Sequence, residues 1–81
     1  MARPTGRRVS DEKLAHDIRE ILTHDPELDA RDIEVEVESG AVTLTGAVAD
    51  SDARLLAEEL VETLPGVREI HNRLRVEPRE E

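Results

Sequence analysis

Residues 33–48, IEVEVESGAVTLTGAV, alternate apolar and polar side chains on either side of Ser39 and Gly40. Alternation with a period of two is typical of a β-strand with one buried and one solvated face. A two-residue turn at Ser39 and Gly40 would fold this stretch into an antiparallel hairpin. The glutamates and threonines would then share the solvated face. The predicted cross-strand pairs are Val37 with Val42, Val35 with Leu44, and Ile33 with Gly46.

A first amphipathic helix is predicted before the hairpin. Ser10 is a suitable N-cap, and the acidic residues that follow it favour a helix N-terminus. The helix should end near His24, because Pro26 biases the residue before it away from helical angles. The loop that follows is expected to bury Leu28. The apolar stripe of this helix consists of Leu14, Ile18, Ile21 and Leu22.

A second helix is predicted after the hairpin, with Asp50 or Ser51 as its N-cap. Its apolar residues recur with helical spacing, and the pair Pro65 and Gly66 should end it. The stripe consists of Ala53, Leu56, Ala57, Leu60, Val61 and Leu64.

A third strand is predicted after Pro65 and Gly66. Its inward positions are Ile70, Leu74 and Val76, and its outward positions are His71, Arg73 and Arg75. Asn72 interrupts the inward row. Together with the second helix, this strand completes a β-α-β crossover, which should be right-handed and parallel.

The neighbours of the third strand depend on which hairpin strand is central. With the first strand central, Glu34 and Glu36 would lie beside Arg73 and Arg75, and opposite charges across a strand pair contribute about 0.2–1 kcal/mol. We therefore expect the spatial order 2-1-3. The predicted fold class is α+β: two layers, with a three-stranded mixed sheet covered on one face by two helices, in the order α-β-β-α-β.

Composition narrows the range of functions. The chain has 81 residues, enough for one domain, and it has no cysteine and no Phe, Tyr or Trp. Without aromatic residues there is no platform for stacking nucleic-acid bases. The net charge of −9 repels phosphate backbones at long range. We therefore expect no nucleic-acid partner.

The charge is unevenly distributed along the chain. Arg3, Arg7 and Arg8 give the first nine residues a charge of +3, and the remaining twenty acidic and eight basic residues carry −12. The sequence predicts a flexible basic arm over residues 1–9, one domain over 10–77 and an acidic tail over 78–81. The basic start lacks the apolar region of a signal peptide, and no run is long enough to span a bilayer, so a cytoplasmic location is expected.

The residues from 10 to 76 resemble the BON domain, a family named for bacterial osmotic-stress and nodulation proteins. A typical member has a V-x-V strand, the run G-x-V-x-L-x-G-x-V, a helix with small inward residues, and the run G-V-x-x-V-x-N-x-L-x-V. The corresponding positions here are Val35, Val37, Gly40, Val42, Leu44, Gly46, Val48, Gly66, Val67, Ile70, Asn72, Leu74 and Val76. The resemblance implies a non-enzymatic binding module with helix-strand-strand-helix-strand topology. It also implies association with membranes or phospholipids in envelope and stress-response proteins.

The motif residues have a structural and a functional interpretation. Gly40 and Gly46 are expected to serve a tight turn and a close approach by a helix or a bulge, and the alternative is that they border a ligand site. Gly66 belongs to the same motif. Asn72 is expected to bond to loop backbone near Asp50 or Pro65, because a buried amide without a partner costs about 1–3 kcal/mol. The alternative is that it holds a ligand.

Several polar residues resemble parts of known sites. Acids follow a calcium-loop spacing at Asp25, Glu27, Asp29 and Glu36. Ala30 replaces the glycine that such a loop needs, so a solvated acidic loop is expected instead. The histidines His16, His24 and His71 lie on separate predicted elements. We expect no catalytic residue, metal, cofactor or small-molecule substrate, and we predict that the protein is not an enzyme.

Two functional hypotheses follow. In the first, the chain is a small interaction module that binds a protein partner or itself, partly through the open edges of its sheet. In the second, it is a peripheral module that associates with phospholipid, and Arg3, Arg7 and Arg8 contact the anionic surface. Three basic residues are fewer than the four to eight of a typical lipid-binding cluster.

Overall fold

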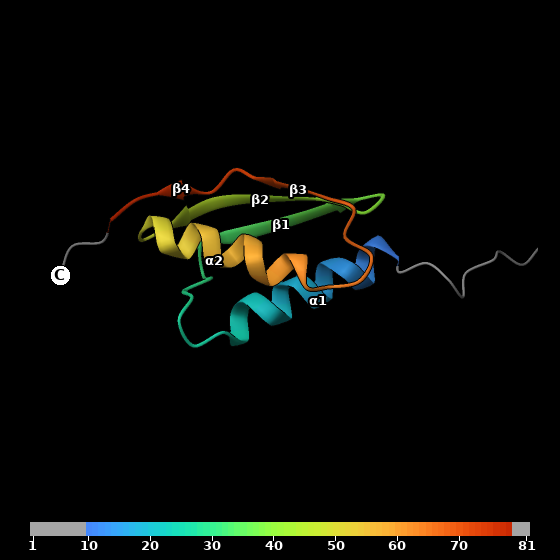
Figure 1. The fold of residues 1–81 in the computed structure, drawn as a ribbon, viewed down its shortest axis with the longest axis horizontal. Coiled ribbons are helices and arrows are strands. Elements are labelled where there is room, and N and C mark those ends of the chain that lie inside the picture. Colours follow the sequence, from blue (N-terminus) through green and yellow to red (C-terminus); the bar gives the residue numbers. More distant parts are fainter. Residues whose placement is uncertain (1–9, 79–81) are drawn as a thin grey trace, which may run out of the picture.

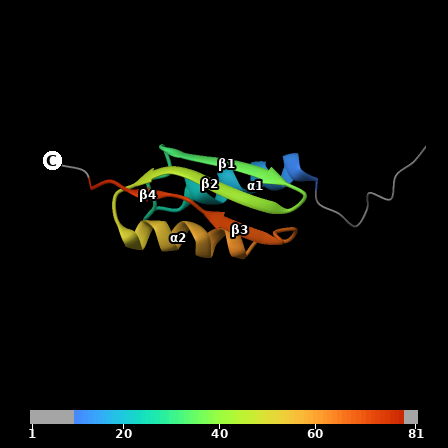
Figure 2. The ribbon, with the colours of Figure 1, turned by 90° about the horizontal axis from the view of Figure 1, so that it is seen from above.

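We describe residues 10–78 of a computed structural model of the chain (Figure 1). Two layers are present: a mixed sheet, and two helices that lie together on one of its faces (Figures 1 and 2). The predicted α+β class is confirmed, with four strands in place of three. In chain order the elements are α1 (Asp11–His24), β1 (Ile33–Glu38), β2 (Ala41–Val48), α2 (Ser51–Glu62), β3 (Glu69–Asn72) and β4 (Arg75–Val76).

Both ends of α1 lie where the sequence predicts them. The Ser10 side chain accepts a hydrogen bond of 3.1 Å from the Lys13 N–H, which satisfies one of the free donors at the helix start. The helix ends at His24, and Asp25, directly before Pro26, has extended backbone angles. The helix buries three of its four predicted stripe residues: Leu14, Ile18 and Leu22.

The hairpin of β1 and β2 has the predicted register. Ile33 pairs with Gly46, Val35 with Leu44 and Val37 with Val42. Ser39 and Gly40 have φ values of +51° and +85°, as a type I′ turn requires at both central positions. The hairpin was predictable because turn and alternation specify the same pairing.

The second helix begins at Ser51, and its N-cap is Asp50. An Asp50 carboxylate oxygen accepts a hydrogen bond of 2.8 Å from the Ala53 N–H. The helix ends at Glu62, shortly before Pro65, and the buried members of its stripe are Ala57 and Val61. Neither α1 nor α2 is long and apolar enough to cross a bilayer.

The predicted strand order is wrong: β2, not β1, is central. The order is β1-β2-β3, and both β3 and β4 pair with β2 in parallel. The inward residues of β2, Val42, Leu44 and Val48, are at most 1% exposed, which explains its central position. Burying one such side chain contributes about 1.5–3 kcal/mol, more than the surface charge pairs on which the order 2-1-3 was based.

The third predicted strand is divided into β3 and β4. Leu74, in the break between them, is buried, and Ile70 in β3 is half-buried. Val76 keeps its predicted inward position, in register with buried Val48, but it is 40% exposed. It pairs with Val48 in a two-residue strand at the end of the sheet, where β2 is its only strand neighbour.

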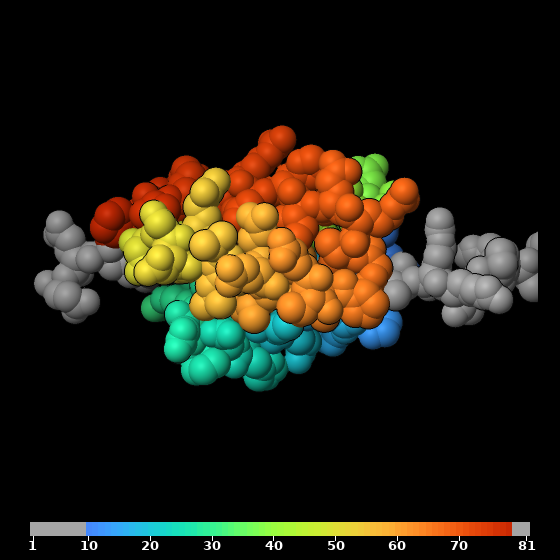
Figure 3. All heavy atoms as spheres, viewed as in Figure 1, coloured from blue at the N-terminus to red at the C-terminus, as the bar shows by residue number. Residues whose placement is uncertain are grey.

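One apolar core lies between the sheet and the helices. The space-filling view shows α2 between the β3–β4 strands and α1, so that it closes this side of the core (Figure 3). Leu28, from the loop after α1, is 6% exposed and belongs to the core as predicted. The buried residues are Leu14, Ile18, Leu22, Leu28, Val35, Val42, Leu44, Val48, Ala57, Val61 and Leu74.

Candidate functional site

Two glycines of the motif, Gly40 and Gly66, lie close together at the turn end of the hairpin. A Cβ atom on Gly40 would lie 2.7 Å from Arg68 Cγ and 2.9 Å from the Gly66 carbonyl oxygen. The Arg68 N–H donates a 2.8 Å hydrogen bond to the Gly40 carbonyl, which joins this turn to the segment before β3. Gly66 itself has a φ of +97°. These contacts account for both glycines by backbone geometry.

Asp11 also belongs to this end of the molecule. Its carboxylate accepts hydrogen bonds from the N–H groups of Ser39, at 2.9 Å, and Gly40, at 3.3 Å. The sequence indicates only a helix-start role for Asp11. The turn lies 28 and 29 residues further along the chain, so no local pattern connects the two.

Gly46 is approached by backbone from β1, not by a helix. Its φ is +113°, and a Cβ atom there would overlap the Asp32 carbonyl oxygen. The same oxygen accepts a 3.3 Å hydrogen bond from the Ala47 N–H. The close approach therefore occurs where β2 meets the start of β1.

Asn72 connects β3 to α2, and its predicted partners near Asp50 or Pro65 are wrong. Its amide group donates to the Arg54 carbonyl at 3.0 Å and to a Glu58 carboxylate oxygen at 3.2 Å. Its amide oxygen accepts from the Leu74 N–H at 3.2 Å. The crossover packs α2 directly beside this strand, which brings the helix closer to Asn72 than either loop. Its amide atoms thus have partners within the domain.

Arg54 covers the same edge of the sheet. Its guanidinium group donates to the Leu74 carbonyl at 3.0 Å and to the Asn72 carbonyl at 3.4 Å. Arg54 and Asn72 together therefore satisfy both backbone groups of Leu74 where β3 ends and β4 has not yet begun. These backbone groups are the ones that an added strand would need.

At the opposite edge, the Arg19 side chain of α1 reaches the Val35 carbonyl of β1 at 3.4 Å. At each edge of the sheet, an arginine from a helix therefore donates a hydrogen bond to at least one backbone carbonyl. The sheet edges are thus partly covered, and not fully open as predicted. Edge pairing with another chain would have to displace these side chains.

The face of the sheet opposite the helices carries no other element among residues 10–78, and we call it the open face (Figure 2). We define its acidic stripe as Glu34, Glu36 and Glu38 of β1, and its basic stripe as His71, Arg73 and Arg75 along β3 and β4. All six residues are exposed. Between the stripes lie half-buried Ala41, Thr43, Thr45 and Ala47 of β2.

The two stripes differ in their ion pairs. His71 lies 2.8 Å from a Glu69 carboxylate oxygen, and Arg75 lies 2.9 Å from Glu77. Within residues 10–78, no glutamate of the acidic stripe forms an ion pair. The β2 residues between the stripes are uncharged alanines and threonines. The open face therefore has two separated stripes of opposite sign.

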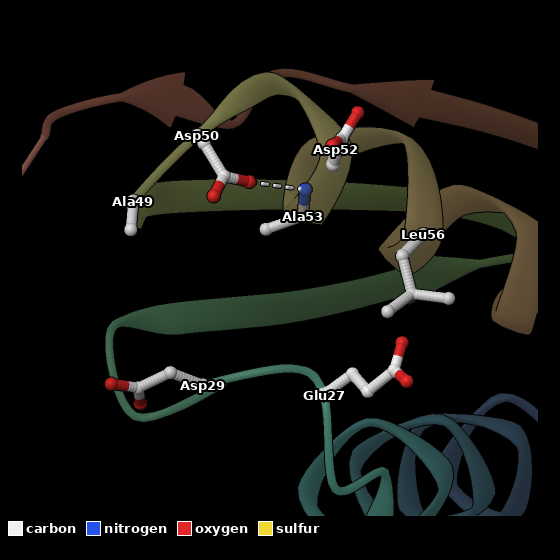
Figure 4. A pocket seen from close by; sticks show the side chains of 7 residues that line it. All are labelled: Glu27, Asp29, Ala49, Asp50, Asp52, Ala53 and Leu56. Atoms are coloured by element: carbon white, nitrogen blue, oxygen red, sulfur yellow. Dashed lines mark hydrogen bonds between the residues drawn. The ribbon is translucent and has the colours of Figure 1, made fainter.

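A pocket of about 290 Å³ lies between the loop after α1 and the start of α2 (Figure 4). Its carboxylates come from Glu27, Asp29, Asp50 and Asp52. Asp50 is engaged as the helix cap, and Asp29 accepts a 2.8 Å hydrogen bond from Arg31. This contact with Asp29 raises the pKa of the exposed Arg31 guanidinium.

The other acids of the calcium-like spacing do not converge on this pocket. Asp25 accepts a 2.8 Å hydrogen bond from the Glu27 N–H, and Glu36 belongs to the open face. In the part of the chain from 10 to 78, no three His, Asp or Glu side chains are grouped so that they could hold a metal ion.

The three histidines lie apart, as their positions in sequence predict. His16 is exposed on α1, and His24 Nδ1 lies 2.8 Å from the Glu20 carbonyl at the end of the same helix. His71 is on the open face. Arg3, Arg7 and Arg8 lie outside the described residues.

The fold is that of a small two-layer α+β domain whose sheet is covered on one face only. The family profile described as BON domain matches residues 10–78, and the chain belongs to this family. Among solved structures, the chain is similar to the C-terminal domain of CdsD, described as the structural protein of the type III secretion system of Chlamydia trachomatis. No curated protein matches the chain in sequence.

The likeness to the CdsD domain has a TM-score of 0.73 at 17% sequence identity. It covers 86% of this chain and 35% of that chain, so our chain corresponds to about a third of the structure it resembles. At this identity the likeness shows a shared fold.

Proposed function

We propose that this chain is a non-enzymatic interaction module that binds a protein partner or a second copy of itself through the open face. The observation that carries the proposal is the presence of two exposed stripes of opposite charge on a face that no helix covers. Complementary charge gives a protein interface its register and excludes wrong partners. Family membership supports a binding role, because the BON resemblance implies a non-enzymatic module.

The structural likeness also supports the proposal. The CdsD domain is part of a protein described as structural in a secretion system, and a structural protein acts through contacts with other proteins. A domain with the same fold is suited to such contacts. The arginines at both sheet edges favour the open face over strand addition as the contact surface.

The proposal is tested with a photo-crosslinking amino acid placed at one position of the chain. Thr43 lies half-buried in the middle of the open face, and exposed Glu59 on α2 is the control position on the opposite side of the domain. Crosslinking in extracts of the source cell should join protein to the Thr43 position and not to the Glu59 position. Absence of protein adducts at Thr43, or equal adducts at both positions, would contradict the proposal.

Phospholipid association is the alternative that the family resemblance implies, with Arg3, Arg7 and Arg8 as the contacts. Each basic residue near an anionic surface contributes about 1 kcal/mol, so the arm supplies at most about 3 kcal/mol. The rest of the chain carries −12 and opposes this attraction. A cytoplasmic location and the division into arm, domain and tail stay predictions.

We expect vesicles of anionic phospholipid to co-sediment little protein at physiological salt, where the Debye length is about 8 Å. Any binding at low salt should be lost when residues 1–8 are deleted. Binding by the truncated protein that persists in high salt would favour the membrane alternative.

A further inference from the structure

We infer that the partner of the open face is a second copy of this chain, packed face to face about a two-fold axis that runs along β2. The inference rests on the proposed function and specifies its partner. In a symmetric dimer the same surface is used by both copies, so that surface must be complementary to itself. A face with an acidic stripe on one side and a basic stripe on the other meets this requirement.

The direction of the symmetry axis follows from the strand order. A two-fold axis parallel to β2 exchanges the two sides of the sheet, so that β1 of one copy lies over β3 and β4 of the other. An axis across the strands would instead place β1 over β1, acidic stripe on acidic stripe. Like charges repel, so only the axis along β2 gives an attractive arrangement.

The register of the sheet determines which residues meet. Glu36 and His71 are both at the level of Thr43, since each pairs with this residue of the central strand. An axis along β2 preserves this level, so Glu36 of one copy faces His71 of the other. The same contact occurs twice, once for each copy.

The next level repeats this arrangement. Glu34 pairs with Thr45, and the Arg73 N–H donates a 2.9 Å hydrogen bond to the Leu44 carbonyl, beside Thr45. Glu34 of one copy therefore faces Arg73 of the other. The threonines and alanines of β2 are short enough to leave room for these longer side chains between the sheets.

One pair at the end of the face is unfavourable. Glu38 and Glu69 both pair with Ala41, so these two carboxylates face each other across the dimer. The net charge of −9 on each copy adds repulsion. We therefore expect a weak dimer, in which an ion pair between Glu34 and Arg73 and a hydrogen bond between Glu36 and His71 are opposed by one repulsive level.

Charge reversal with rescue tests the inference. Sedimentation equilibrium of the full chain from about 10 μM to about 1 mM covers the range of a weak complex. Glu34→Arg with Glu36→Arg, and separately Arg73→Glu with Arg75→Glu, should each weaken self-association by about tenfold or more, because each variant places like charges opposite one another. An equimolar mixture of the two variants should restore a heterodimer, because at the level of Glu34 and Arg73 both of its contacts again join opposite charges.

The matched control is Glu59→Arg with Glu62→Arg on α2, which changes the net charge by the same amount as the change on β1. This control should associate at least as well as the original chain, since it lowers the overall repulsion. Recovery in the mixture also shows that both reversed variants are folded. A monomeric original chain up to about 1 mM, or equal association by the β1 variant and the control, would overturn the inference. Crosslinks from Thr43 to another protein would still support the interaction module.

Discussion

The β1–β2 hairpin and the β3–β4 strand are neighbours in one sheet, but they are held in different ways. The hairpin has six consecutive cross-strand pairs, and the two residues of its turn, Ser39 and Gly40, both have the positive φ of a type I′ turn. The β3–β4 strand has four pairs, a break and two further pairs, and side chains of α2 satisfy the backbone at the break. The hairpin is specified locally, whereas the last strand depends on contacts with α2.

The last strand has an inward and an outward set of side chains with different contacts. The Asn72 side chain donates a hydrogen bond to the Arg54 carbonyl of α2, and the Arg54 side chain donates one to the Asn72 carbonyl of β3. The exposed residues around them, His71, Arg73 and Arg75, lie on the open face. The last strand thus combines inward groups that attach it to α2 with outward groups that are exposed on the open face.

The largest effect is expected within the hairpin. Gly46→Val should lower the free energy of unfolding by about 3 kcal/mol, because a branched side chain is strained at a φ of +113° and overlaps the Asp32 carbonyl. Urea denaturation measures this loss. Ser39→Ala, at the exposed turn, is the control and should change stability much less. Equal urea midpoints for the two variants would refute this account of the hairpin.

The hairpin was predictable in full because turn residues and alternating side chains specify the same register. The caps at Ser10 and Asp50 were predictable for the same reason, since each bonds within one helical turn. The strand order was not predictable from Glu34 and Arg73, because surface charge pairs are weaker than burial of the apolar row of β2. The relevant comparison was between the inward rows of β1 and β2, because the more deeply buried row belongs to the central strand.

The contacts of Asp11, Asn72 and Arg54 were also beyond sequence reasoning. Asn72 and Arg54 are 18 residues apart, and Asp11 reaches a turn 28 residues away, so only the packed fold brings these groups together. The sequence correctly predicted an inward polar residue in the last strand. It could not distinguish a partner on α2 from one in a loop, because both lie on the covered face of the sheet.

An intermediate effect is expected at the break in the last strand. Asn72→Leu removes the hydrogen bonds to the Arg54 carbonyl and the Leu74 N–H, so stability should fall by about 1–3 kcal/mol in urea denaturation. His71→Leu, at the neighbouring outward position, should stay within about 0.5 kcal/mol of the original chain. A gain in stability for Asn72→Leu would indicate that Asn72 is retained to bind a ligand.

The smallest effect, and the one that best separates the two regions, is expected from the arginines at the sheet edges. Arg54→Met should cost about 1 kcal/mol, because the Leu74 and Asn72 carbonyls lose their donor, while Arg19→Met removes a single long contact to Val35. Native-state hydrogen exchange locates the loss. The N–H groups of Arg73 and Glu77, which bond to β2, should exchange about fivefold faster in Arg54→Met and unchanged in Arg19→Met. The pairs between β1 and β2 should stay protected in both variants, since neither substitution removes a hydrogen bond between these strands. Equal acceleration across all strands would mean that the sheet opens as one unit and that the last strand is not held separately.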